Sequence, residues 1–484
     1  MRLADLIGPE VPATDKEIRG LAEDSRKVRP GYLFAALAGT KTDGARFIDD
    51  ALSRGAVAVL TTPDAPIPDA DIVALRDPNP RRRFAALAAR FYGPQPDTIV
   101  AVTGTNGKTS VASFTRQIWE QMGHRAASIG TLGVVAEGLE RETGLTTPDI
   151  VTLHETLREL REREITHVAC EASSHGLVQY RLDGLRLAAA AYTNLSRDHM
   201  DYHATVEDYF FAKARLFGQL LPPGGVAVIN MDDPFGADLE GLCWARGHRL
   251  IRIGHDAGDI RLLKRRPHDA GQELTIGHDG GVTDVALPLV GEFQALNALT
   301  AAALVIGCGG EAQAAFRALE HLRAVPGRME LVSVLGNGAR VYVDYAHTPD
   351  ALKTVLQALR PHVQGRLVVV FGCGGDRDRG KRPLMGAAAS EFADKVYVTD
   401  DNPRSEEPAA IRAEILKAAP GAVEIGDRAA AIEAAMRDLQ PGDMLVVAGK
   451  GHERGQIIKG EVRDFSDFAE VRKVAAAIER GGGQ

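Results

Sequence analysis

The stretch DTIVAVTGTNGKTSVASFTRQIWEQMG, residues 97–123, organises the rest of the chain. Ile99 to Val102 is a short run of β-branched and apolar residues, which is typical of a fully buried strand. From Ser110 onward, apolar residues recur at helical spacing and predict an amphipathic helix. The glycine-rich loop between this strand and this helix therefore has the position of a phosphate-binding loop.

The residue types in this loop suit a nucleotide phosphate. Glycines let backbone N–H groups turn toward an anion, a lysine brings positive charge to the β- and γ-phosphates, and a hydroxyl can reach Mg²⁺. Val102 stands where the usual motif has its first glycine, so the loop is of a shortened kind. The alternative, a glycine-rich turn beside an unrelated lysine, leaves the flanking strand and helix unexplained. The candidate ATP contacts are Gly104, Thr105, Asn106, Gly107, Lys108, Thr109 and Ser110.

Length and composition limit the class of protein. A chain of 484 residues predicts two or three domains, each with its own core. The net charge of −8 comes with both signs interspersed, which argues against a general binder of nucleic acid or membranes. No leader and no bilayer-length apolar run is visible, so we expect a cytoplasmic protein without membrane insertion. The four cysteines are scattered singly, which favours neither disulfides nor a zinc site.

The chain divides into three predicted units. Residues 1–93 form a small α/β domain, and the Pro- and Gly-punctuated segment 91–97 leads into the second unit, residues 94–325. The third unit, residues 326–484, repeats the order strand then polar loop four times, with helices between. This order predicts a doubly wound sheet in which the polar loops converge on one edge.

The loop TGTNGKTS, together with the later motifs DNPR and GKGHE, resembles the Mur ligase family almost from end to end. The resemblance implies an α/β fold of three domains, with a central phosphate-loop ATPase-like parallel sheet and a C-terminal Rossmann-like domain. It also implies an ATP-dependent, Mg²⁺-assisted amide ligation through an acyl phosphate. The members most similar in their motifs add meso-diaminopimelate to UDP-N-acetylmuramoyl-L-alanyl-D-glutamate (UDP-MurNAc-L-Ala-D-Glu), and the expected protein is a monomer.

The resemblance assigns one group of residues to the nucleotide-linked substrate. By composition alone, Asp24 to Arg26 is a turn with a satisfied Asp, and Thr146 and Thr147 start a helix, with a hydroxyl as N-cap and Pro148 at its first position. Leu145 stands where many members have Asn. The expected substrate contacts are Ser25, with residues 40–42 nearby, and Thr146, Thr147, Ser173, Gln179 and Arg181.

A second group is expected to bind Mg²⁺ and ATP. Glu171 follows an apolar run, at the carboxyl end of a predicted strand, where it can take Mg²⁺. A lysine in a helix, such as Lys213, is usually a solvated side chain. In the resembling ligases, the matching lysine carries a carbamate formed with CO₂, which would share the metal with Glu171 and His199. The family positions for ATP in the rest of the chain are Asn297, near the unusual Gln294, and Asp344 and His347.

A third group is expected to select the amino acid. Diaminopimelate differs from lysine by a distal carboxylate, which the Arg404 guanidinium can engage with paired hydrogen bonds. The alternative is that Arg404 only pairs with Glu406 or Glu407 at the surface. The expected contacts are Arg377, Asp401, Asn402, Pro403, Arg404, Gly449 and Glu453. A basic cluster is expected to offset the repulsion between the two anionic substrates: Arg377, Arg379, Lys381 and Arg382.

Three other classes of protein have a similar phosphate loop but do not account for the other motifs of this chain. A ligase of the folylpolyglutamate synthase type has a similar loop but no use for an N-terminal uridine domain or for DNPR. A phosphate-loop motor or switch would hydrolyse ATP without an amine substrate, and a non-catalytic nucleotide-binding module would turn over nothing. Both leave DNPR and GKGHE unexplained.

Overall fold

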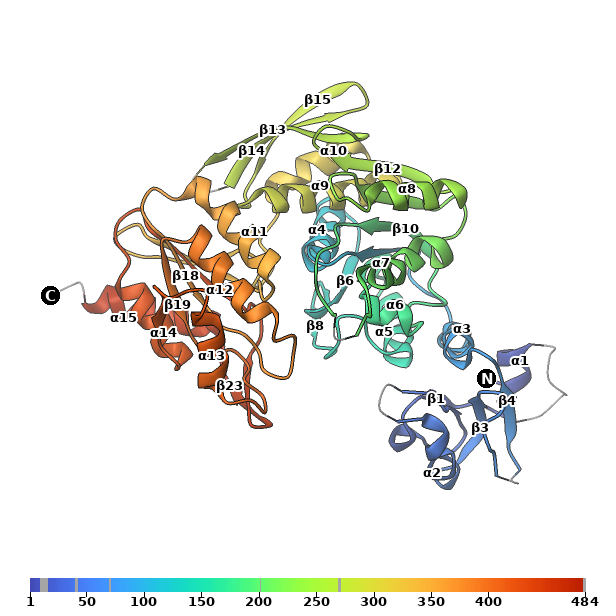
Figure 1. Cartoon of the computed structure of the whole chain (residues 1–484). Coiled ribbons are helices and arrows are strands. Elements are labelled where there is room, and N and C mark those ends of the chain that lie inside the picture. The colour runs from blue at the N-terminus through green and yellow to red at the C-terminus, as the bar shows by residue number, and fades with distance from the viewer. Residues whose placement is uncertain (9–15, 40–41, 69–70, 201, 269–270, 482–484) are drawn as a thin grey trace.

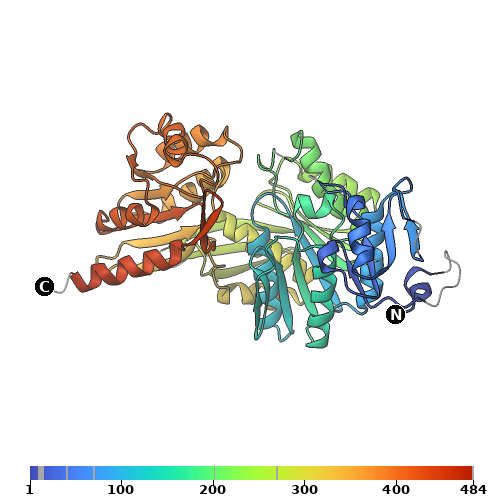
Figure 2. The same ribbon diagram turned by 90° about the horizontal axis from the view of Figure 1, so that it is seen from below.

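Three large sheets follow one another along the chain in the computed structural model. The structure describes residues 1–8, 16–39, 42–68, 71–200, 202–268 and 271–481. Figures 1 and 2 show the N-terminal and C-terminal sheets on opposite sides of the central one. Each large sheet has its own buried apolar cluster, as the sequence length predicts.

The N-terminal domain is a four-stranded parallel sheet in the order β1-β2-β3-β4. Its strands are β1 (Gly20–Ala22), β2 (Tyr32–Ala35), β3 (Ala56–Thr61) and β4 (Val73–Arg76). Its helices are α1 (Leu3–Ile7), α2 (Ile48–Ser53) and α3 (Pro80–Tyr92). The expected amphipathic helix and the apolar strand after it are α2 and β3. Five residues of loop then lead from α3 to the central domain.

The central domain is an 11-stranded sheet, parallel from β6 to β13 and antiparallel at both edges. Its strands are β5 (Thr98–Thr103), β6 (Ala126–Gly130), β7 (Gly133–Ala136), β8 (Leu139–Arg141), β9 (His167–Glu171), β10 (Leu187–Tyr192), β11 (Val226–Asn230), β12 (Arg249–Gly254), β13 (Ile260–His268), β14 (Gly271–His278) and β15 (Gly281–Leu287). Its helices are α4 (Lys108–Gln121), α5 (Ile150–Glu162), α6 (Ser174–Val178), α7 (Val206–Arg215), α8 (Gly236–Ala245), α9 (Glu292–Gly307) and α10 (Ala312–Ala318).

Strand β5 lies between β10 and β9, and it is buried on both faces because helices cover the sheet on each side. Helix α4 packs against α9 with its apolar stripe, which contains Val111, Phe114 and Ile118. The predicted strand, loop and helix are therefore confirmed. The loop between them opens at the carboxyl edge of the sheet, where α/β folds place their ligands.

The C-terminal domain is a six-stranded sheet in the order β16-β17-β21-β18-β19-β20, with only its edge strand β16 antiparallel. Its strands are β16 (Glu330–Val334), β17 (Arg340–Asp344), β18 (Leu367–Phe371), β19 (Lys395–Val398), β20 (Val423–Glu424) and β21 (Met444–Ala448), beside the separate ribbon β22 (Gly455–Ile458) and β23 (Glu461–Asp464). Its helices are α11 (Pro349–Leu359), α12 (Lys381–Phe392), α13 (Pro408–Leu416), α14 (Arg428–Arg437) and α15 (Asp467–Gly481). Helices cover both faces, so the predicted doubly wound fold is confirmed.

Two helix predictions need comment. Helix α5 begins at Ile150 and Asp149 is its N-cap, so the expectation that Thr146 or Thr147 caps it is wrong. The Asp149 carboxylate accepts from the Thr152 N–H, and this frees both threonines for other contacts. Helix α7 continues into a π-helical turn, residues 216–220, and thus covers the helix expected around Lys213. Among the described residues, no helix is long and apolar enough to cross a bilayer.

Candidate active site

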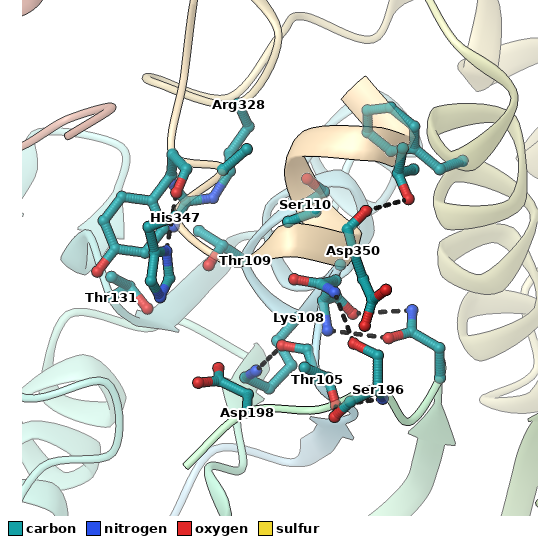
Figure 3. Close-up of a pocket in the computed structure, with 18 of the residues that line it drawn as sticks. Thr105, Lys108, Thr109, Ser110, Thr131, Ser196, Asp198, Arg328, His347 and Asp350 are labelled. Atoms are coloured by element: carbon teal, nitrogen blue, oxygen red, sulfur yellow. Dashed lines mark hydrogen bonds between the residues drawn. The ribbon is translucent and has the colours of Figure 1, made fainter. Parts of the chain in front are cut away.

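A cavity of about 450 Å³ lies between the central and C-terminal domains. The central domain contributes the phosphate loop and the loops after β9 and β10, while the C-terminal domain contributes the loop after β17 and helix α11. Figure 3 shows Lys108 and Thr105 of the phosphate loop together with Arg328, His347 and Asp350, which come from the C-terminal part of the chain. A molecule in this cavity would therefore touch both domains.

The phosphate loop is folded so that its lysine bonds to the loop itself. Lys108 Nζ donates to the Gly104 carbonyl at 2.9 Å and to the Thr105 carbonyl at 2.7 Å. Gly104 and Gly107 have φ of 149° and 86°, a backbone region that side chains disfavour. Burial lowers the pKa of Lys108, although Glu171 and Asp198 oppose this. A phosphate placed over the loop would offer this ammonium a charged partner in place of two carbonyls.

Asn297 on α9 faces the same loop. A Cβ at Gly107 would lie 2.5 Å from Asn297 Oδ1, so only glycine fits there. The Asn297 amide donates to Gln294 Oε1 at 3.0 Å, and Gln294 in turn donates to the Arg328 carbonyl at 3.3 Å. Gln294, the departure from the family pattern, thus ties Asn297 to the segment that leads into the C-terminal domain.

Glu171 lies at the end of β9 beside the first turn of α4. Its Oε1 accepts from the Thr131 N–H at 2.7 Å, and its Oε2 accepts from the hydroxyls of Thr109 at 3.1 Å and Thr131 at 3.2 Å. The side chain is 2% exposed. The expected pair of metal ligands, a carboxylate and a phosphate-loop hydroxyl, is therefore in direct contact, and Ser110 lines the same cavity.

Lys213 is buried, with 1% of its surface exposed, which excludes the alternative of a solvated helix lysine. Its Nζ donates to the Gly104 carbonyl at 2.7 Å and lies 4.1 Å from the centre of the Tyr209 ring. Burial and the nearby Lys108 hold the pKa of Lys213 well below its ordinary value, against the opposing charge of Asp198. Lys213 therefore lines the cavity beside the phosphate loop.

His199 completes this group of side chains. It has φ of 55° and its Nε2 lies 3.6 Å from the Asp198 carboxylate. Burial lowers the pKa of His199 despite Asp198. Burial opposes the charge on Asp198, but His199 and His347 outweigh it and lower the pKa of Asp198. Across the described ranges, no three His, Cys, Asp or Glu side chains are close enough together to hold a metal by themselves.

The residues expected to bind the muramoyl peptide form a connected group beside Glu171. Thr147 Oγ1 donates to the Glu171 carbonyl at 2.8 Å and lies 3.0 Å from Ser173 Oγ. Thr146 Oγ1 lies 3.1 Å from Thr131 Oγ1. Arg181 donates to the Thr147 carbonyl at 2.7 Å and to Gln179 Oε1 at 2.7 Å.

The N-terminal part of this expectation lies in another domain. Ser25 is buried in the first turn of a 3₁₀ helix that Asp24 caps by accepting from the Arg26 N–H at 3.0 Å. The composition-based interpretation of a satisfied Asp is therefore confirmed. Residues 40 and 41, part of the same expectation, lie outside the described residues.

Asp344, expected to contact ATP, is held by the backbone. Its Oδ2 accepts from the Met329 N–H at 2.7 Å and its Oδ1 from the Ala346 N–H at 2.7 Å. Burial raises the pKa of Asp344. His347 lines the cavity, and its carbonyl accepts from Lys381 Nζ at 2.8 Å. Asp344 therefore anchors the interdomain linker, while His347 faces the nucleotide side.

The expected amino-acid residues come together at the carboxyl edge of the C-terminal sheet. Arg404 Nη1 donates to the Gly375 carbonyl at 2.7 Å, in the loop that carries the exposed Arg377. Asn402 Nδ2 donates to Glu453 Oε2 at 3.0 Å. A Cβ at Gly449 would lie 2.7 Å from the Asp401 carboxylate. Pro403 is buried between Asn402 and Arg404.

One expectation about the basic residues is wrong, and one alternative is excluded. Arg382 has no exposed side-chain surface and pairs with Glu406 at 2.8 Å and Glu414 at 3.1 Å, so it cannot meet an anionic substrate. Arg379 pairs with the other oxygen of Glu406 at 3.1 Å. The surface pairing of Arg404 with Glu406 or Glu407 is not found among the described residues. Two arginines of α12 and its preceding loop occupy Glu406 instead.

Sequence reasoning missed two cations. Arg328, in the segment VPGRME, lines the cavity, and its guanidinium lies 4.3 Å from the centre of the Tyr345 ring. Lys450, in GKGHE, is fully buried between Asn402 and Glu453. The position of Arg328, at the junction of the second and third predicted units, could have indicated that it lies near the nucleotide. Lys450 gave no signal, because a lysine in a polar loop is ordinarily exposed.

The fold and the cavity define a phosphate-loop enzyme whose candidate nucleotide site is lined by two domains. Family models match in three consecutive parts: "Mur ligase family, catalytic domain" at residues 17–92, "Mur ligase middle domain" at 102–305 and "Mur ligase, glutamate ligase domain" at 327–451. The chain belongs to the Mur ligase family. It is therefore an ATP-dependent amide-forming ligase.

Several relatives match over nearly the whole chain. The UDP-N-acetylmuramoyl-L-alanyl-D-glutamate--2,6-diaminopimelate ligases of Bradyrhizobium diazoefficiens and Rhizobium meliloti are each 55% identical to it, over 99% of this chain and 99% or 100% of theirs. A solved structure of a ligase with the same description is 34% identical, covers 100% of both chains and has a TM-score of 0.74. The chain thus resembles these proteins in length, in sequence and in domain order.

Proposed function

We propose that this chain joins meso-diaminopimelate to UDP-MurNAc-L-Ala-D-Glu at the expense of ATP, in the synthesis of a peptidoglycan precursor. The observation that carries this function is the 55% identity, over essentially full length, to relatives named for that reaction. The local observation that favours it is the joining of the DNPR and GKGHE loops by the contact between Asn402 and Glu453. A motor, a switch or a non-catalytic module has no use for such a second site.

The chemistry is activation of a carboxylate followed by attack of an amine. The substrate carboxylate attacks the γ-phosphorus of ATP, ADP leaves, and the resulting acyl phosphate is attacked by the amine, which expels phosphate through a tetrahedral intermediate. The task of the protein is to align two polyanions and stabilise developing negative charge. Lys108 would contact the phosphates, with Asn106, Thr109 and Ser110 around them and Asn297 on the adenine side. Arg328 and His347 would close the cavity from the C-terminal domain.

The donor set at Glu171 fits Mg²⁺. A carboxylate and a hydroxyl are hard oxygen ligands, and Glu171 Oε2 and Thr109 Oγ1 are 3.1 Å apart. Bound Mg²⁺ would supply charge neutralisation for the phosphate groups during transfer. Lys213 would contribute a third oxygen donor as a carbamate with CO₂, because its buried amine lines the same cavity and a free ammonium there would repel the metal. His199 is the remaining proposed ligand.

The two other substrates are assigned to residues of different domains. Ser25 would contact the uridine nucleotide, while Thr146, Thr147, Ser173, Gln179 and Arg181 would contact the muramoyl dipeptide. Diaminopimelate would lie on the C-terminal domain, with Arg404 on its distal carboxylate. The residues around its remaining carboxylate and ammonium groups would be Arg377, Asp401, Asn402, Pro403, Gly449 and Glu453. We also propose that the protein acts as a monomer in the cytoplasm. Its use of ATP favours that compartment, and its mass in solution tests the monomer.

One assay tests the function against its alternatives. Phosphate release from ATP is measured with UDP-MurNAc-L-Ala-D-Glu and each candidate amino acid, added singly and together. We expect release only when the nucleotide-linked dipeptide and meso-diaminopimelate are both present. Release with ATP alone would indicate a motor or switch, and release with folate substrates would indicate the folylpolyglutamate synthase type. Either result would overturn the proposal.

A further inference from the structure

A buried lysine lies directly behind the two loops that carry the proposed amino-acid site. Lys450 follows β21, and none of its side-chain surface is exposed. Its Nζ donates to Asn402 Oδ1 at 3.0 Å and to Glu453 Oε2 at 2.8 Å. Both of these partners belong to the proposed diaminopimelate site, whereas Lys450 itself has no surface that a substrate could touch.

The contacts of Glu453 are asymmetric. Its Oε2 accepts from both Lys450 Nζ and Asn402 Nδ2, at 2.8 Å and 3.0 Å. Its Oε1 has no hydrogen-bond partner in the described part of the chain, and the side chain is 32% exposed. Oε2 is thus fixed by Lys450 and Asn402, while Oε1 is available to a ligand.

Asn402 is fixed in the same way. Its Oδ1 accepts from Lys450 Nζ and from the Ile457 N–H at 2.9 Å, and its Nδ2 donates to Glu453. These contacts fix the orientation of the Asn402 amide, with Oδ1 toward Lys450 and Ile457 and Nδ2 toward Glu453. They also join the DNPR loop, the GKGHE loop and ribbon β22–β23 around the Asn402 amide.

We infer that Lys450 is a positioning residue for amino-acid selection. It aligns Glu453 so that the free oxygen accepts from an ammonium group of the incoming amino acid, and it fixes Asn402 beside it. This inference rests on the proposed function, because it names the residue that prepares the amino-acid site. Lys450 acts through Glu453 and touches no reacting atom.

The test compares Lys450→Met with Lys395→Met. Lys395 is a matched control, since it lies in the same domain and pairs with Asp438 at 2.8 Å, but at the opposite end of the sheet. We expect Lys450→Met to raise the KM for meso-diaminopimelate about 10- to 100-fold, which is the usual effect of losing an orienting partner. The KM values for ATP and for UDP-MurNAc-L-Ala-D-Glu should stay unchanged, as should all three in Lys395→Met.

A double-mutant cycle separates positioning from general stability. If Lys450 acts through Glu453, adding Glu453→Gln to Lys450→Met costs little more than either change alone. Independent effects that multiply, or equal rises in all three KM values, would overturn the inference. Should Lys450→Met not fold, Lys450→Gln, which keeps an N–H donor, takes its place in the same cycle. A wild type that ignores diaminopimelate would refute the proposed function, whereas an active wild type with an unchanged Lys450→Met would refute this inference alone.

Discussion

Lys213 on α7 and Lys450 after β21 are both buried lysines, yet their surroundings differ. Lys450 bonds to the Glu453 carboxylate and to an amide oxygen. Lys213 bonds to the Gly104 carbonyl and lies against the Tyr209 ring, with Lys108 near enough to lower its pKa. One ammonium is paired with an opposite charge, and the other has only neutral groups in contact.

The difference indicates what each lysine is for. A buried charge is tolerated when it is paired and hydrogen-bonded, which is the situation of Lys450 beside Glu453 and Asn402. A buried amine without a carboxylate partner favours its neutral form, which is the form that reacts with CO₂. Under the two proposals above, the same residue type is a fixed support in one domain and a modifiable group in the other. The predictions below test this contrast, beginning with the largest effect.

Lys108 extends the comparison to a third lysine, which is half-buried and bonds to carbonyls of its own loop. We expect Lys108→Ala to lower kcat by about 10³-fold or more, because the loop loses its contact with phosphate charge. The melting temperature should stay close to that of the wild type, since the side chain bonds to its own loop and is not part of the apolar core. Lys417→Ala, at an exposed position, is the control. Normal ligation by a folded Lys108→Ala protein would contradict the phosphate-loop assignment.

Lys213→Ala should lower kcat by about 10²-fold, with partial recovery when formate or acetate is added, because a small carboxylate can replace the carbamate oxygen. Nuclear magnetic resonance with isotopically labelled bicarbonate should show one carbamate in the wild type. That signal should persist in Lys450→Met and disappear in Lys213→Ala. If the signal disappeared in Lys450→Met instead, Lys450 and not Lys213 would be the modified lysine. Full activity of Lys213→Ala without added carboxylate would show that the reaction needs no carbamate at Lys213.

Arg404→Ala tests the charge on the amino-acid side. Losing charge-assisted hydrogen bonds to one carboxylate should lower kcat/KM for meso-diaminopimelate by about 2 to 3 kcal/mol in transition-state stabilisation, or roughly 30- to 150-fold. The value for L-lysine, which lacks the distal carboxylate, should change little. Arg463→Ala, on the exposed ribbon strand β23, serves as control. An unchanged preference in Arg404→Ala, or a wild type that prefers lysine, would contradict the assignment.

The smallest expected effect is on stability and comes from Glu23. It extends the comparison of buried charged groups from lysines to a carboxyl group. Burial and the neighbouring Asp149 raise the pKa of Glu23 to about 7 from its ordinary 4.5. The folded protein therefore keeps a proton that the unfolded chain releases. The stabilisation is complete below pH 4.5 and is lost as pH rises through about 7.

We therefore expect Glu23→Gln to be more stable than the wild type at pH 8 by about 1 to 2 kcal/mol, and to differ little at pH 4.5. Thermal unfolding at the two pH values measures this, with Glu17→Gln, at an exposed position of the same domain, as control. Equal pH dependence in wild type and Glu23→Gln would show that Glu23 is ionised at neutral pH.

Local pattern was enough to predict the elements around the phosphate loop. The spacing of apolar residues identified β5 and α4, and the rule that polar loops follow parallel strands brought Asn402 and Glu453 together although they are far apart in sequence. The resemblance supplied the roles of these residues. Contact geometry added that Thr109 and Glu171 meet, as their proposed shared ligand requires.

One error and one omission share a physical cause, which is that sequence does not show which charges are buried. Arg382 resembles its basic neighbours, but two glutamates from later segments pair with it in the interior. Lys450 is buried because the DNPR loop covers it. The burial of these two cations depends on partners that the fold brings from elsewhere. The remaining error is local: Thr147 was expected at a helix start, yet the better cap, Asp149, stands two residues later and shifts the helix.

The linker between the central and C-terminal domains lies backbone to backbone on the GKGHE loop. A Cβ at Gly327 would be 2.3 Å from the His452 nitrogen, and one at Gly451 would be 2.8 Å from the Gly327 carbonyl. If the C-terminal domain rotates about this linker, GKGHE lies at the pivot and travels least, whereas α11, on the cavity wall, acts as the lever arm. Such a rotation would change the shape of the nucleotide cavity, which two domains line. The amino-acid site lies within the C-terminal domain, so its geometry would stay the same in open and closed states.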